Sequence, residues 1–182
     1  MTMSREVFLS ILAMDSYQRG YEVGIKGLTR TTIGAATIKN IDLPAGAEAV
    51  GFFASAYDWT GTTVISYRGT DFDAATRKLS EPDSQYARDL LHGWTTFLTT
   101  SLPAQFPLAR AFFKSVTGRD FSDGTPEGYN LVSNTIVTGH SLGGALAGFV
   151  DARVNVDSYL ADPIPYAVLG TNDNFSLLDI AA

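Results

Sequence analysis

The chain has 182 residues, of which 45% are hydrophobic and 18% charged, and its formal net charge is −6. This length and apolar content suffice for one domain with a sizeable core. The negative net charge argues against a surface that binds nucleic acid or an anionic membrane. The absence of cysteine excludes a disulfide scaffold, a thiolate metal site and a cysteine nucleophile. Two histidines are too few for a histidine-rich metal site, so neither a metal nor a cofactor is predicted.

The N-terminal segment predicts an amphipathic helix rather than an export signal. Residues 4–18 have helical spacing with a cap near Ser4. The predicted apolar face consists of Val7, Phe8, Ile11, Leu12 and either Met14 or Asp15. Ser10 interrupts the apolar run and no small-residue cleavage site follows, so a signal peptide is not predicted. No stretch reaches the ~18 apolar residues of a membrane span. We therefore expect a cytoplasmic protein, or one exported by a route that its N-terminus does not encode.

The next part of the chain alternates turn residues with apolar runs. Residues 31–41 predict an edge strand or an irregular cover over the sheet. The apolar runs 49–57 and 62–67 are joined across Asp58-Trp-Thr-Gly61, which is the pattern of a β-hairpin. The second run leads directly into Arg68-Gly-Thr70.

The middle of the chain is less regular. Residues 71–86 are polar without a clear period, which fits either a lid over a site or a solvated connecting loop. An apolar run at 90–98 precedes a helical pattern at 103–116, and a Gly/Asp/Pro-rich loop is predicted at 118–129. The chain shows no repeat, low-complexity tract or linker, so residues 1–182 are predicted to form a single domain.

The most informative stretch is residues 134–147, Asn-Thr-Ile-Val-Thr-Gly-His-Ser-Leu-Gly-Gly-Ala-Leu-Ala. It joins a β-branched run, a Gly-x-Ser-x-Gly turn and a small-residue segment with helical spacing. This context predicts a nucleophile elbow, in which a sharp turn lifts Ser141 above the sheet edge. A side chain at Gly139 or Gly143 is expected to collide with the neighbouring strand or helix. Ser141 is therefore the predicted nucleophile, and the N–H of Leu142 a predicted oxyanion donor. The alternative is an ordinary glycine turn that enters a helix.

The residues Gly139-His-Ser-Leu-Gly-Gly144 are similar to the elbow of α/β-hydrolases of the lipase group. Val64-Ile-Ser-Tyr-Arg-Gly-Thr70 resembles the strand and turn of class 3 (fungal-type) lipases. Ala87-Arg-Asp-Leu-Leu-His-Gly-Trp94 resembles the region between lid and helix in that family. The resemblance implies an α/β-hydrolase-like fold with a mostly parallel sheet, helices on both faces and Ser141 at the carboxyl end of a central strand. It also implies that residues 71–86 form a lid.

The same resemblance implies a function. The expected reaction is hydrolysis of hydrophobic or lipid carboxylic esters through an acyl-enzyme on Ser141. Thr70 would supply the second oxyanion donor; the alternative is a threonine that bonds locally at a strand end. A transacylase would differ only in its acceptor. A further alternative is a catalytically incomplete module that acts through another chain.

Two polar residues near the elbow are predicted to be structural. Arg68 is expected to pair with a carboxylate, either Asp71 or Asp89. His140 is expected to bond beneath the sheet edge, because adjacent side chains in the elbow point away from one another. His92 is predicted to pack or to begin a helix rather than to act as the base.

The acid and the base of the triad are not assigned. In α/β-hydrolases they follow the serine in the order Asp or Glu, then His, but no histidine follows Ser141. The available carboxylates are Asp162, Asp173 and Asp179, and Asp162 comes too early for the acid of the family. We therefore expect a domain that lacks its C-terminal strands, with a sheet that ends at strand 156–160. A C-terminal segment, a second chain or another copy of this chain would cover that edge.

Overall fold

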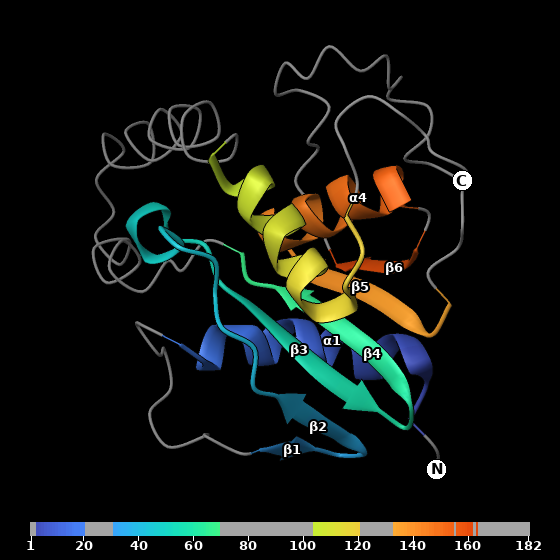
Figure 1. Cartoon of the computed structure of the whole chain (residues 1–182). Helices are drawn as coiled ribbons and strands as arrows, with labels where there is room; N and C mark the ends of the chain where they lie inside the picture. Colours follow the sequence, from blue (N-terminus) through green and yellow to red (C-terminus); the bar gives the residue numbers. More distant parts are fainter. Residues whose placement is uncertain are drawn as a thin grey trace, which may run out of the picture.

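A computed structural model describes residues 3–20, 31–69, 104–120, 133–154, 156–161 and 163. Within these ranges a mixed six-stranded sheet carries helices on both faces, which is an α/β architecture (Figure 1). The helical elements are α1 (Arg5–Asp15), η1 (Ser16–Gln18), η2 (Glu48–Val50), residues 104–117 and α4 (Leu142–Val154). The strands are β1 (Thr32–Ile33), β2 (Ala36–Lys39), β3 (Ala54–Trp59), β4 (Thr62–Tyr67), β5 (Thr135–His140) and β6 (Asp157–Ala161).

The expectation of a mostly parallel sheet is wrong. The sheet order is β1-β2-β3-β4-β5-β6, and the pairings from β1 through β4 are antiparallel. The β3–β4 connection consists of Thr60 and Gly61, both at positive φ, with the Gly61 N–H bonded to Asp58 Oδ1 at 2.9 Å. So short a loop can join only antiparallel neighbours. The hairpin was predicted, but the antiparallel pairing that it imposes on β3 and β4 was not included in the predicted sheet.

The other half of the sheet is parallel and holds the elbow strand. β5 lies between β4 and β6 and is parallel to both, with Tyr67 opposite Gly139 and His140 opposite Ala161. The carboxyl ends of these three strands therefore meet at one edge of the sheet. Ser141 follows β5 at that edge. Within the described ranges β6 is the last strand of the sheet, as predicted.

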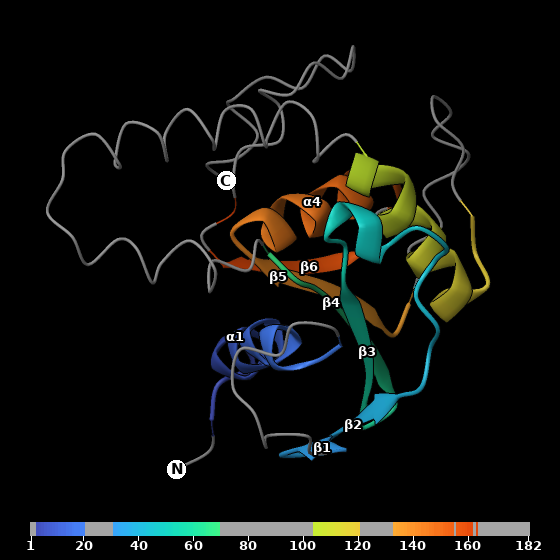
Figure 2. The ribbon, with the colours of Figure 1, turned by 90° about the vertical axis from the view of Figure 1, so that its left-hand side faces the viewer.

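Two apolar clusters cover the two faces of the sheet (Figure 2). α1 packs on one face through Phe8, Leu9 and Leu12, against Tyr57, Val64 and Ile136. On the other face α4 and the helix at 104–117 pack together, and the rings of Phe106 and Phe149 stack at 4.3 Å. The predicted helix at 103–116 is thus confirmed. No helix in the described ranges is long and apolar enough to cross a membrane.

The predicted apolar face of α1 is only partly right. Ser4 caps the helix as expected, and its hydroxyl accepts from the Val7 N–H at 3.3 Å. Phe8 and Leu12 are buried, but Val7 and Ile11 are exposed. The buried side chains instead include Leu9 and Ala13, so the contact face is turned by about one residue, or ~100°. Because both faces of this helix carry apolar residues, packing against the sheet decides which face is buried.

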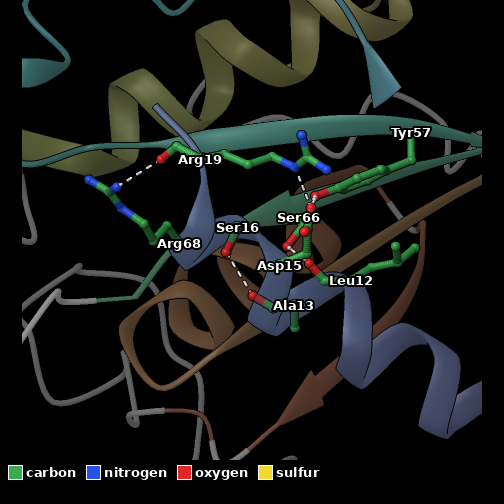
Figure 3. A network of polar contacts seen from close by, with 8 residues as sticks. All are labelled: Leu12, Ala13, Asp15, Ser16, Arg19, Tyr57, Ser66 and Arg68. Atoms are coloured by element: carbon green, nitrogen blue, oxygen red, sulfur yellow. Dashed lines mark hydrogen bonds and ion pairs between the residues drawn. The ribbon is translucent and has the colours of Figure 1, made fainter. Parts of the chain in front are cut away.

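A polar network joins the end of α1 to the sheet (Figure 3). The Asp15 carboxylate accepts from Tyr57 Oη at 2.7 Å and is also paired with Arg19. The Ser66 hydroxyl donates to the Leu12 carbonyl at 3.1 Å. Burial, followed by the Asp15 charge, raises the pKa of Tyr57, so its phenol stays protonated and acts as the donor. The network fixes α1 in register with β3 and β4.

Replacing Asp15 with alanine should lower the free energy of unfolding by about 3 kcal/mol, because Tyr57 and Arg19 then lose a shared, largely buried acceptor. Urea denaturation measures the change. Asp157→Ala is the matched control, since it breaks an exposed ion pair with Arg5 and should cost less than about 0.5 kcal/mol. Equal losses in the two variants would contradict the role given to the Asp15 network.

Candidate active site

Ser141 occupies the single turn residue between β5 and α4. Its φ is +56°, in the left-handed region that costs an L-residue about 1–3 kcal/mol. The backbone holds it there: the Ser141 N–H donates to the Ala161 carbonyl at 3.0 Å, and the Ala145 N–H donates to the Ser141 carbonyl at 3.2 Å. The other described non-glycine residues at positive φ, Thr60 and Asn134, lie in turns that precede strands. A strained serine between strand and helix is therefore particular to this turn.

The two glycines that flank Ser141 have no room for side chains, as predicted. A Cβ on Gly139 would lie 2.2 Å from the Gly143 carbonyl oxygen, in the first turn of α4. A Cβ on Gly143 would lie 2.0 Å from the Tyr67 carbonyl oxygen, at the end of β4. Both contacts are to backbone atoms, which cannot rotate aside. The glycines thus permit the start of α4 to sit directly on the strand ends.

Leu142 is the first residue of α4, and its side chain is buried in the core. The N–H groups in the first turn of a helix have no acceptor inside the helix, and they carry the positive end of its dipole. The N–H of Leu142 is one of these groups and immediately follows Ser141. No described side chain forms a hydrogen bond with the Ser141 hydroxyl.

The turn after β4 lies against the elbow. A Cβ on Gly69 would be 2.6 Å from the carbonyl oxygen of His140. Arg68 is buried; its Nη1 donates to the Arg19 carbonyl at 3.2 Å, and its guanidinium lies 4.8 Å from the centre of the Phe53 ring. Thr70, the next residue, lies outside the described ranges, as do the carboxylates Asp71 and Asp89 predicted to pair with Arg68.

His140 points away from the α4 side of the sheet, as predicted. Ile136, four residues earlier on β5, packs in the apolar cluster beneath α1. Side chains alternate between the two faces along a strand, so His140 lies on the same face as Ile136. Its Nδ1 lies 3.1 Å from the Tyr17 hydroxyl. Tyr17 was missed by sequence reasoning, because it lies 123 residues away in the chain and no local pattern singles it out.

Several predicted residues cannot be compared with the structure. His92, Asp162, Asp173, Asp179 and residues 71–86 all lie outside the described ranges. The acid and base of the triad therefore stay unassigned. Within the described part of the chain, no group of three or more His, Asp or Glu residues is placed to hold a metal ion.

A cavity of about 340 Å³ lies at the opposite end of the sheet from Ser141. Its lining includes Trp59, Asn134 and Asp157, at the amino ends of β5 and β6 and at the β3–β4 turn. Ligands of open α/β sheets bind beyond the carboxyl ends of the strands. The position of this cavity therefore gives it no part in chemistry at Ser141.

No protein-family model matches the sequence, and no curated protein matches it either. The resemblance to class 3 lipases therefore stays a prediction from short stretches of the chain, above all residues 139–144 and 64–70.

Proposed function

We propose that the chain has an α/β-hydrolase-like fold and hydrolyses carboxylic esters through a seryl acyl-enzyme. The observation that carries the proposal is the elbow: Ser141 at φ +56° between β5 and α4, flanked by glycines that tolerate no Cβ. Strained backbone conformations cluster at functional sites, where they hold a reactive side chain in place. A glycine turn without a chemical role would place glycine, not serine, at the strained position.

The surroundings of Ser141 suit the charge that acyl transfer develops. An attacking serine converts the ester carbonyl into an oxyanion, which fixed N–H donors stabilise. The Leu142 N–H at the start of α4 is the first proposed donor, and the helix dipole adds to its effect. Thr70, which follows Gly69 in the chain, is the second proposed donor. A Cβ on Gly69 would lie 2.6 Å from the His140 carbonyl oxygen, and this close approach supports the assignment.

The proposed substrates are hydrophobic or lipid esters. This part of the proposal rests on the resemblance of residues 64–70 and 139–144 to class 3 lipases. The attacking hydroxyl also requires a base oriented by a carboxylate, and these two residues remain to be identified.

An alkyl fluorophosphonate should label the native protein at Ser141, because the probe reacts with an activated serine and not with an ordinary one. Mass spectrometry of the digested protein locates the adduct. Unfolding in urea should abolish labelling, since the activation depends on the geometry of the elbow.

Ser158→Ala is the matched control variant. Ser158 has a carboxylate partner, with its hydroxyl 2.6 Å from Asp151 Oδ2, but it is exposed on β6 and lies outside the elbow. Labelling should be unchanged in this variant. A native chain that does not react at Ser141 would refute the hydrolase proposal and favour a non-catalytic module.

A further inference from the structure

The hydroxyl of Tyr17 lies where the two halves of the candidate site meet. It is 3.1 Å from Nδ1 of His140 and 3.4 Å from the carbonyl oxygen of the same residue. Gly69 also lies close to this hydroxyl, because a Cβ on Gly69 would be 2.1 Å from it. One oxygen atom thus contacts the residue before the nucleophile and the residue before the proposed second oxyanion donor.

We propose that Tyr17 is a positioning residue that fixes the spacing between the Ser141 elbow and the turn at Arg68 and Gly69. The inference rests on the ester hydrolase function proposed above, because that spacing matters only if Ser141 attacks and the turn supplies a donor. Tyr17 acts through His140 and touches neither substrate nor reacting atoms.

The contact persists in either neutral tautomer of His140. With Nδ1 unprotonated, the Tyr17 hydroxyl donates to it at 3.1 Å. With Nδ1 protonated, the ring donates to the Tyr17 oxygen, and the hydroxyl donates to the His140 carbonyl at 3.4 Å. The position of His140 is therefore tied to Tyr17 whichever nitrogen carries the proton.

Tyr17 is itself held rigidly, as a positioning residue must be. It lies in η1, where the buried hydroxyl of Ser16 donates to the Ala13 carbonyl at 2.7 Å. On the other side of Tyr17, the Arg19 carbonyl accepts from Arg68 Nη1 at 3.2 Å (Figure 3). The segment is thus fixed to the end of β4 as well as to α1.

Tyr17→Phe should lower kcat for a p-nitrophenyl ester about tenfold and leave KM within about twofold. The oxyanion forms only in the transition state, so a misplaced donor affects kcat, and a shift of 1 Å can cost up to about 10²-fold. The rate of fluorophosphonate labelling should fall by a similar factor. A general loss of stability would not produce this separation of kcat from KM.

Tyr57→Phe is the matched control. Tyr57 lies on β3, and its hydroxyl donates to Asp15 at the end of α1 instead of contacting the elbow. The urea concentration at which half of this variant is unfolded should fall, with kcat unchanged. A double-mutant cycle with His140→Ala tests whether Tyr17 acts through His140. In the His140→Ala background, Tyr17→Phe should have little further effect on kcat.

The outcomes separate this inference from the proposed function. If the parent chain reacts at Ser141 but Tyr17→Phe keeps the parent kcat and labelling rate, the positioning role alone is refuted. A full tenfold loss that persists in the His140→Ala background also refutes it. If the parent chain fails to react at Ser141, the hydrolase function falls, and the positioning role falls with it.

Discussion

Ser141→Ala should abolish ester turnover, with a loss of about 10⁴-fold or more, because the proposed acyl-enzyme forms on the Ser141 hydroxyl. The fold should survive, since the change removes one oxygen atom from a half-buried side chain. Hydrolysis of p-nitrophenyl esters measures the activity, and circular dichroism with urea denaturation measures the fold. Undiminished turnover would exclude Ser141 from the mechanism.

The backbone at Ser141 adds a second, independent readout. Alanine retains the strain of φ +56°, whereas glycine adopts this conformation without it. Ser141→Gly should therefore be as inactive as Ser141→Ala but more stable by about 1 kcal/mol. An inactive yet stabilised glycine variant would show that the serine is kept at a cost to stability. If glycine were no more stable than alanine, the strain assigned to the elbow would be refuted.

Gly143→Ala should destabilise the domain by more than about 3 kcal/mol. Two effects oppose one another at this position. Alanine favours a helix by up to about 1 kcal/mol over glycine. Its Cβ, however, would lie 2.0 Å from the Tyr67 carbonyl oxygen, so either α4 or β4 must move by about 1 Å or more. The collision outweighs the gain in helix propensity, because the new Cβ is fixed rigidly to the α4 backbone and meets a backbone atom of β4. Both residues are buried, so neither can move aside easily.

Gly144→Ala is the control for this prediction, one residue further along the same helix. Its Cβ would meet Pro163 at 3.0 Å and the Gly139 carbonyl oxygen at 3.2 Å, contacts that a shift of a few tenths of an ångström relieves. The expected cost is less than about 1 kcal/mol, partly offset by helix propensity. Urea denaturation of both variants gives the comparison. Similar stability of the two would contradict the close approach of α4 to β4.

Local patterns in the sequence predicted the elements that form the site. The β-branched run, the Gly-x-Ser-x-Gly turn and the small residues after it correspond to β5, the turn at Ser141 and α4. The β3–β4 hairpin and the helix at 104–117 were predicted in the same way. These elements were predictable because each depends on residues within a few positions of one another, through turn geometry or the spacing of apolar side chains.

Within the described residues, the sequence by itself therefore determined the turn between β3 and β4, the course of β5 and α4, and which serine stands at the strained position between them. The tertiary structure alone decided the antiparallel pairing of β2 with β3, the face of α1 that is buried, and the meeting of Tyr17 with His140 and Gly69. Periodicity describes one element at a time and does not specify its neighbour. Tyr17 reaches the elbow only because α1 lies across β4 and β5, which brings residues 123 positions apart into hydrogen-bonding distance.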